Sequence, residues 1–389
     1  MATPEKKSTS RIARVVLVAI SVFFAVIVAE VSLRIVKVPS SPVSSITPEK
    51  IQANARLTRY DRELGWIGAS IQDGMYWGDN YSFPVRQNSH GLRGPELDTQ
   101  KQVGKVRVLV LGDSQTWGLG VPEQERYSDV LQSILNEHGM NAEVLNFGVP
   151  GYGTDQELML FKTLGKAYHP DLVILGFFWN DLFENSRDNT YGHPKPRFVF
   201  DRSGELKLTN VPVPEKEEVG DSSSPAAGSS KDWLRQHSRL YELAERGVSR
   251  NSVIYSWAVR IGLAAGPKRD PASGEWKVTV SLLQALRTEV DKNGSKFLIV
   301  VIPEPADLNA DAHSLKAPLF KDFERLPVFD PFQNLDKGGS VESLYFPNDM
   351  HLRPLGHKVL AKAIADYLLK DEKLLVRPAV QTTAVIVKQ

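Results

Sequence analysis

The chain contains no cysteine, and this absence removes several kinds of chemistry at once. Disulfide bonds, a thiolate nucleophile and cysteine-ligated metal sites are all excluded. The absence does not fix the compartment, because a domain of this size folds without disulfides. An excess of charge of one sign is also lacking, since the formal net charge is +1 over 389 residues. Nothing in the overall charge therefore points to a nucleic-acid partner.

A long apolar run lies near the N-terminus, at residues 15–29. Extended to residues 12–33, it would form about 33 Å of helix, enough for a hydrocarbon core of about 30 Å. Glu30 near its end is placed to pair with Arg34 four residues later. The run is preceded by the basic residues Lys6, Lys7, Arg11 and Arg14.

This charge pattern predicts a cytoplasmic tail and a transmembrane signal anchor within residues 1–38. The bulk of the protein is then expected on the extracytoplasmic side, periplasmic or extracellular. The alternative is a signal peptide that is cleaved. The small-x-small pattern of a cleavage site is poorly formed around "VIVAEVS", which favours the uncleaved anchor.

Between the anchor and the first predicted core strand, residues 39–102 are expected to form a stalk and an irregular lead-in. The stalk is rich in proline and serine, and the lead-in carries aromatic residues without clean periodicity. A long insertion is expected at about residues 182–278, disordered around 213–232. It is expected to hold a hairpin over 197–208 and helices around 233–248. Residues 373–389 are interpreted as a loose tail, or alternatively as an edge strand over 382–388.

Over residues 103–372, apolar strand patterns alternate with helical ones. The predicted strands cover residues 106–111, 142–149, 170–178 and 296–303. The predicted helices cover residues 126–139, 154–168, 280–294 and 354–370, the second with Thr154 as its N-cap. Strands that are apolar on both faces are typical of a parallel sheet covered by helices on both sides. The predicted fold class is therefore α/β, a three-layer α/β/α sandwich with a mainly parallel sheet.

Polar residues gather where the predicted strands end. The first strand runs into Gly112-Asp113-Ser114, the second into "NFGVPGYGT", and the third into Asn180 and Asp181. Asp349 and His351 stand just before the last helix. Because ligand sites in open parallel sheets lie beyond the carboxyl ends of the strands, these clusters are expected to converge.

The order of these four blocks resembles the SGNH (GDSL-type) hydrolases, a family named for a serine, a glycine, an asparagine and a histidine. The matching residues are Ser114 in "GDSQT", Gly151 in "NFGVPGYG", Asn180 in "FWND" and His351 in "NDMHL". The resemblance covers about residues 106–369, interrupted by the insertion, and implies the flavodoxin-like fold of that family. The upstream pattern "ELGW … SHGLRGPE" looks like the lead-in of membrane-anchored bacterial members.

The resemblance implies a catalytic set of Ser114, His351 and Asp349, with no metal and no cofactor. Ser114 would be the nucleophile, His351 the base, and Asp349 the group that orients the imidazole. The oxyanion hole would consist of the Ser114 and Gly151 backbone N–H groups and the Asn180 amide. Thr116 stands where a G-x-S-x-G nucleophile elbow has its last glycine, which argues against the α/β-hydrolase fold.

The acidic position departs from the family's commonest spacing. Asp-x-x-His would place Asn348 opposite the histidine, whereas the chain offers Asp349 two residues before His351. We expect Asp349 to be the partner, because it is the only carboxylate that close. Asn348 would control the imidazole tautomer less well.

Several other polar residues near these blocks have structural explanations. Asp113 is expected to bond backbone in the turn, Asp181 to act as a structural cap, and His357 to lie in packing or on the surface. Asn180 is also compatible with a helix N-cap or Asx-turn, and His313 has no evident partner. A further set consists of aromatic residues that would stack on sugar rings or belong to the core: Trp117, Phe177, Phe178, Trp179 and Phe183.

Three functions remain open on the sequence. The first is a serine esterase or acyl-hydrolase that cleaves ester-linked acyl groups, acetyl in particular, from a small-molecule or carbohydrate ester such as envelope or extracellular polysaccharide. The second is an O-acyltransferase that uses the same acyl-enzyme to acetylate exported polysaccharide. The third is a catalytically inactive envelope binding protein that keeps the fold.

Overall fold

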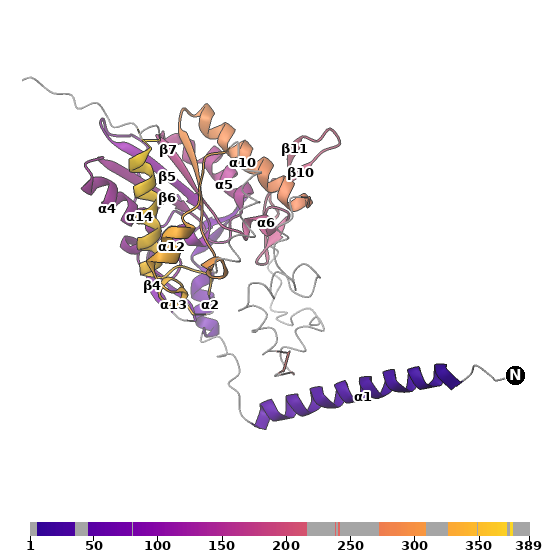
Figure 1. The fold of residues 1–389 in the computed structure, drawn as a ribbon. Helices are drawn as coiled ribbons and strands as arrows, with labels where there is room; N and C mark the ends of the chain where they lie inside the picture. The colour runs from indigo at the N-terminus through magenta and orange to yellow at the C-terminus, as the bar shows by residue number, and fades with distance from the viewer. Residues whose placement is uncertain are drawn as a thin grey trace, which may run out of the picture. The chain divides into compact units, whose positions relative to one another are not determined.

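The computed structural model describes residues 6–35, 46–79, 81–215, 238, 240–241, 272–308, 326–347, 349–371 and 374–375. The chain divides into two units, Met1–Ser45 with Glu218–Ala258, and Ile46–Glu217 with Val259–Gln389. In the first unit, α1 (Lys6–Ile35) carries the apolar run (Figure 1). Its segment Val16–Ile35 has a mean hydropathy of 2.7 and is long and apolar enough to cross a membrane. Arg34 pairs with Glu30 at 2.9 Å, as expected from their spacing.

The second unit is built on a five-stranded sheet with the order β13-β12-β7-β5-β6. Every neighbouring pair in this sheet is parallel. The strands are β5 (Val106–Gly112), β6 (Ala142–Gly148), β7 (Leu172–Phe177), β12 (Lys296–Val301) and β13 (Val328–Phe329). In chain order this is the 2-1-3-4-5 arrangement of a flavodoxin-like sheet, so the order reverses between β5 and β7.

Helices cover both faces of this sheet (Figure 1). One face carries α4 (Tyr127–Glu137) and α14 (Pro354–Lys370), with the short helices α12 (Phe332–Gly338) and α13 (Val341–Leu344) beside α14. The other face carries α5 (Thr154–Thr163) and α10 (Gly274–Lys292). The structure is therefore the predicted three-layer α/β/α sandwich.

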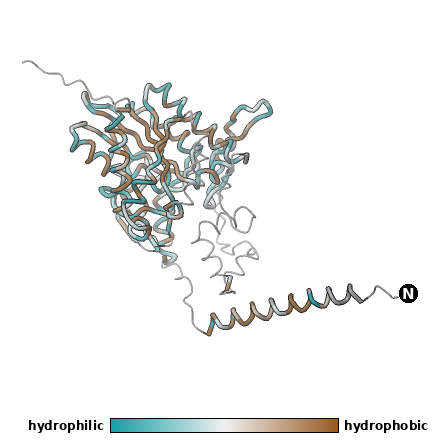
Figure 2. Tube along the Cα trace, in the orientation of Figure 1, coloured by the Kyte–Doolittle hydropathy of each residue, from teal (hydrophilic) through white to brown (hydrophobic). Residues whose placement is uncertain are grey.

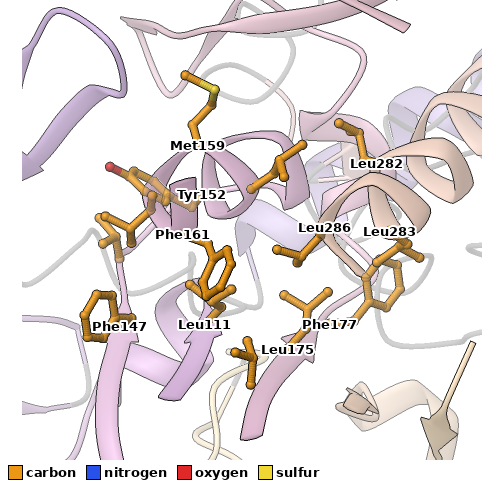
Figure 3. Close-up of a cluster of buried hydrophobic side chains, with 14 of the residues drawn as sticks. Leu111, Phe147, Tyr152, Met159, Phe161, Leu175, Phe177, Leu282, Leu283 and Leu286 are labelled. Carbon is orange, nitrogen blue, oxygen red and sulfur yellow. The ribbon is translucent and has the colours of Figure 1, made fainter. Parts of the chain in front are cut away.

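Alternation along β5 shows how one strand serves both layers. Val108 and Val110 belong to the hydrophobic cluster of α4 and α14. Leu109 and Leu111 belong to the cluster of α5 and α10. Figure 3 shows side chains of α5 and α10 turned toward strand residues in the second cluster, and Figure 2 shows the sheet as a hydrophobic centre. Successive side chains of a strand point to opposite faces, so a doubly covered strand is apolar throughout.

Most predicted elements are confirmed, with shifts at their ends. The helix predicted over 280–294 begins earlier, at Gly274, where the Ser273 hydroxyl caps it by accepting the Trp276 N–H at 3.1 Å. The helix predicted over 154–168 divides into α5 and a 3₁₀ turn, Gly165–Tyr168. Thr154 is not the N-cap, since that position belongs to Gly153. The Thr154 hydroxyl is turned instead to Asp181 Oδ2 at 3.0 Å.

The lead-in is not irregular, and that prediction is wrong. It contains α2 (Pro48–Ala55) and two antiparallel hairpins. The hairpins are β1 (Thr58–Asp61) with β2 (Gly65–Gly68), and β3 (Ile71–Trp77) with β4 (Ser82–Gln87). A register shift between Ile71 and Gly74 interrupts the alternation in β3, and Pro84 stands inside β4. The register shift hides the period of two in β3, whereas β4 alternates strictly between exposed and buried residues.

The insertion starts with α6 (Asp181–Glu184) and two hairpins. These are β8 (Asn189–Thr190) with β9 (His193–Pro194), and the predicted hairpin, β10 (Arg197–Phe200) with β11 (Leu206–Thr209). Val213, expected to begin the disordered stretch, is instead buried, and its N–H donates to the Arg62 carbonyl at 2.7 Å. The rest of that stretch lies outside the described residues, apart from 214–215. So do nearly all of the expected helices around 233–248 and of the C-terminal tail.

Candidate active site

Ser114 stands where β5 turns abruptly into a short helix, α3 (Ser114–Trp117). Asp113 caps this turn, and its Oδ1 accepts the Gln115 N–H at 2.8 Å. Gly112 has φ +155, and a Cβ there would lie 2.0 Å from Thr116 Oγ1. The turn therefore needs glycine just before Asp113, and it holds Ser114 at the carboxyl end of a central strand.

Ser114, His351 and Asp349 form a continuous hydrogen-bonded chain. Ser114 Oγ lies 2.8 Å from His351 Nε2, and His351 Nδ1 lies 2.5 Å from Asp349 Oδ1. The His351 backbone N–H also donates to Asp349 Oδ1 at 3.1 Å. The His351 and Asp349 side chains are 17% and 22% exposed, so the chain is accessible but mostly shielded from water. The Asp-x-His spacing thus brings the carboxylate onto the imidazole, while Asn348 lies outside the described residues.

The Asp349 carboxyl is held in its ionised form. Burial acts to raise its pKa, but hydrogen bonds from His351 and Tyr81 outweigh burial, and the pKa lies below its ordinary value. The Tyr81 hydroxyl donates to Asp349 Oδ2 at 3.0 Å. An ionised acceptor on Nδ1 favours the tautomer that leaves Nε2 free to accept from a hydroxyl.

Gln115 links the histidine loop to the serine turn, a role that the sequence did not indicate. Its buried side chain donates to the Met350 carbonyl at 2.8 Å and accepts the Leu352 N–H at 3.4 Å. These two bonds bracket His351. The sequence offers only its position beside Ser114 as a signal, because the bonded residues are more than 230 positions away.

The loops of Ser114, Gly151 and Asn180 leave the sheet at the same level. Strand register pairs Gly112 with Gly148 on β6 and with Gly176 on β7. Gly151 has φ +77, the left-handed region that favours glycine. A Cβ there would lie 3.0 Å from the Tyr191 ring. The structure therefore brings the predicted blocks together at the point where the strand order reverses.

The Asn180 amide makes two hydrogen bonds. Its Nδ2 donates to Asp113 Oδ2 at 3.1 Å and to Glu184 Oε1 at 3.0 Å. Asn180 occupies the N-cap position of α6, but its side chain caps no helix N–H. Glu184 Oε1 also accepts the Tyr191 hydroxyl at 2.5 Å. A polar network thus continues from Asp113 into the protein, away from His351.

A buried acidic cluster lies along this network, consisting of Asp113, Asp155, Glu157, Asp181 and Glu184. Burial raises the pKa of each of these carboxyls, that of Glu184 to about 8. The buried Lys195 ammonium pairs with Asp155 and donates to the Glu184 carbonyl at 3.1 Å. Among the described residues, no donor reaches either Glu157 carboxyl oxygen. No group of three or more histidine, aspartate or glutamate side chains in the described part is arranged to hold a metal ion.

The other residues singled out in the sequence lie in the following surroundings. His357 is buried, its Nδ1 accepts the Tyr127 N–H at 3.2 Å, and burial lowers its pKa to about 3. Arg187 lies over the half-buried Phe183 ring at 3.7 Å. His313 lies outside the described residues. The other aromatic candidates are buried in the core: Trp117, Phe177, Phe178 and Trp179.

A strand–turn–helix serine, a histidine and an aspartate on a flavodoxin-like sheet are the arrangement of a serine hydrolase. The sequence model of the GDSL-like lipase/acylhydrolase family matches residues 110–359, which is more than half of the chain. The protein therefore belongs to this family, as the four blocks predicted. It is 33% identical over 75 residues to an arylesterase from Vibrio mimicus. That alignment spans 19% of this chain and 38% of the arylesterase.

Two solved structures also match this chain, at low sequence identity. An acetylxylan esterase from Geobacillus stearothermophilus is 12% identical, with a TM-score of 0.36, and covers 67% of this chain and 92% of its own. A family 3 carbohydrate esterase from Clostridium thermocellum is 13% identical, with a TM-score of 0.38. It covers 68% of this chain and 96% of its own.

Proposed function

We propose that the protein is a serine esterase that removes ester-linked acyl groups through a Ser114 acyl-enzyme. The observation that carries the proposal is the chain from Ser114 Oγ through His351 to Asp349, with distances of 2.8 and 2.5 Å. A serine hydroxyl is weakly nucleophilic without an adjacent base, and this chain supplies one that is itself oriented. The arylesterase similarity supports an ester as the substrate.

In the first half of the reaction, Ser114 Oγ attacks the ester carbonyl carbon while His351 Nε2 takes its proton. The tetrahedral intermediate collapses when the C–O bond to the alcohol breaks and His351 returns that proton to the leaving oxygen. In the second half, His351 deprotonates a water molecule, whose oxygen attacks the acyl carbon. The bond from that carbon to Ser114 Oγ then breaks, His351 returns the proton to Oγ, and the acid is released. Asp349 stabilises the imidazolium formed in each half.

The oxyanion would be met by the Ser114 and Gly151 backbone N–H groups and by the Asn180 amide. Asn180 already uses its N–H groups on Asp113 and Glu184, so the oxyanion would take over one of them. Loss of a single such donor typically costs about 10²- to 10³-fold in kcat. We expect a loss of this order in Asn180→Ala.

For the substrate class, we propose acyl groups, acetyl in particular, on envelope or extracellular polysaccharide. Basic residues at the start of α1 precede its apolar run, which favours insertion with the N-terminus in the cytoplasm and the second unit outside it. Reporter fusions after residue 46 and at the C-terminus test this orientation. Activity of a cytoplasm-specific reporter at both places contradicts it.

The central test uses the full chain in detergent with aryl esters of increasing acyl length and with an acetylated oligosaccharide. Ser114→Ala is expected to lose at least about 10⁴-fold in kcat. Ser133→Ala, an exposed serine on α4, is the matched control and should keep full activity. An unchanged rate in Ser114→Ala contradicts the proposal. With an unacetylated oligosaccharide added, the acetyl group is either released as free acetate or transferred to that acceptor. Free acetate as the main product identifies an esterase, and the acetylated acceptor identifies an acyltransferase.

A further inference from the structure

Asp349 is contacted on both of its carboxylate oxygens, from two distant parts of the chain. Oδ1 faces His351, through the ring at 2.5 Å and the backbone N–H at 3.1 Å. Oδ2 accepts the Tyr81 hydroxyl at 3.0 Å. Tyr81 lies in the β3–β4 hairpin, before the segment 110–359 that the family model matches. A residue outside that segment therefore reaches the innermost member of the serine–histidine–aspartate chain.

The Tyr81 ring is held firmly enough to aim its hydroxyl. It contacts the Phe346 ring, with centroids 4.6 Å apart, and stacks against Tyr76 at 6.4 Å. Its carbonyl accepts the Gly78 N–H at 2.8 Å, closing the hairpin turn. A Cβ at Gly78 would lie 2.4 Å from the ring, so only glycine allows the ring to lie where it does. Phe346 belongs to the loop of Asp349, whose N–H donates to the Phe346 carbonyl at 3.2 Å.

In this hydrogen bond Tyr81 is the donor and Asp349 is the acceptor. Burial and the nearby Asp349 charge raise the pKa of Tyr81 well above its ordinary value, so the phenol stays protonated and donates. A hydrogen bond to a charged acceptor is stronger than one between neutral groups. It fixes the rotation of the carboxylate, and with it the side that faces His351. Other titratable groups facing this pair are Tyr76 and Asp79, both from the same hairpin region.

We propose that Tyr81 is a positioning residue of the active site, whose hydroxyl orients Asp349 against His351 and joins the N-terminal hairpin to catalysis. The proposal deepens the esterase function and rests on it. The site is then a four-membered chain, Tyr81–Asp349–His351–Ser114. The family segment taken alone would lack its first member.

Tyr81→Phe tests the proposal in the full chain, because it removes the hydroxyl and keeps the ring. Loss of a hydrogen bond to a charged group predicts a fall of about 10-fold in kcat, with KM nearly unchanged. The pKa of Asp349 should rise, because its ionised form loses a hydrogen bond. Tyr76→Phe is the matched control, since this ring lies in the same cluster and its hydroxyl makes no hydrogen bond to Asp349. It should change neither quantity.

Two further readouts separate this proposal from the esterase function. The first is the rate at which a fluorophosphonate probe labels Ser114, expected to fall about 10-fold in Tyr81→Phe. The second is a carbon-13 NMR titration of the Asp349 carboxyl, assigned with Asp349→Asn, which reports the contact whether or not esters are cleaved. An unlabelled wild-type Ser114 contradicts the esterase function. If the Asp349 carboxyl titrates in Tyr81→Phe as it does in the wild type and in the Tyr76→Phe control, the proposed role of Tyr81 is overturned.

Discussion

Two polar clusters extend from the end of β5, and the pKa values of their carboxyls are shifted in opposite directions. On one side, Asp349 is partly exposed and accepts bonds from His351 and Tyr81, which keep it ionised. On the other side, Glu157, Asp181 and Glu184 are fully buried, and burial raises the pKa of each. Hydrogen bonds thus favour the ionised carboxyl in one cluster, and burial opposes ionisation in the other.

The difference follows mainly from burial, because Asp349 is partly exposed and faces His351, whereas the carboxyls of the acidic cluster are fully buried. Asp349 has a donor on each oxygen, and hydrogen bonding to the charged form lowers a carboxyl pKa. In the acidic cluster one buried lysine, Lys195, faces several carboxyls, so most of them gain less from ionising than they lose in hydration. Asp113 belongs to the acidic cluster but also connects it to the serine turn, since it accepts the Gln115 N–H on one oxygen and the Asn180 amide N–H on the other.

Asp349→Asn is expected to break the first cluster and to have the largest effect on activity of the changes compared here. The amide would donate to His351 Nδ1 and impose the tautomer whose Nε2 carries a proton, so Ser114 would lose its base. The expected fall in kcat is about 10⁴-fold, measured with aryl acetates. Asp366→Asn, an exposed residue of α14, is the control. A fall of less than tenfold would show that Asp349 does not set the tautomer.

Lys195→Met is expected to break the second cluster. Removing one partner of a buried ion pair leaves Asp155 without compensation, which costs about 3–5 kcal/mol in the free energy of unfolding. Lys207→Met removes an exposed partner of Asp201, 3.5 Å away, and should cost less than about 1 kcal/mol. Chemical denaturation of the full chain in detergent, followed by tryptophan fluorescence, measures both. Equal losses in the two variants would contradict the buried pair.

Glu184→Gln is expected to sharpen the comparison with a smaller effect, seen in the pH dependence of stability. The pKa of Glu184 in the folded protein is about 8, against 4.5 for an ordinary glutamate. The folded state therefore binds the proton more tightly, and the stability this contributes is full below about pH 4.5 and lost as pH rises to about 8. The slope is at most about 1.4 kcal/mol per pH unit for one proton.

The glutamine keeps the acceptor for Asn180 and Tyr191 but does not ionise. Between pH 5 and pH 8 the melting temperature of Glu184→Gln should therefore fall less than that of the wild type. Glu205→Gln, in the exposed β10–β11 turn, is the control and should follow the wild type. If Glu184→Gln follows the wild type as well, Glu184 is not a buried protonated acid.

Several parts of this arrangement could be predicted from the sequence, for a specific reason. Apolar strands that alternate with amphipathic helices have few ways to pack, so the three-layer fold followed from periodicity. Parallel strands end at one edge, so blocks as distant as Ser114 and His351 were expected to meet there. The fifth strand, β13, escaped notice because it has only two residues, Val328 and Phe329.

The supporting contacts could not be predicted in the same way. Tyr81 contacts Asp349 across 268 positions, from a hairpin whose first strand loses its alternation at a register shift. No sequence pattern predicts the buried ion pair of Lys195 and Asp155. Gln115 is distinguished in the sequence only by its place beside Ser114. Such contacts depend on side-chain direction and burial, which are properties of the packed molecule.

The sequence by itself determined the alternation of the main strands and helices of the sandwich, the absence of thiol chemistry, and the residues that stand at the strand ends. These are local consequences of residue type and period. The tertiary structure alone decided that Asp349 faces His351 with Tyr81 behind it, and that four other carboxyls join Asp113 in a buried acidic cluster. Ionisation depends on how many donors surround a carboxyl and how much water is excluded, and only the folded chain fixes both.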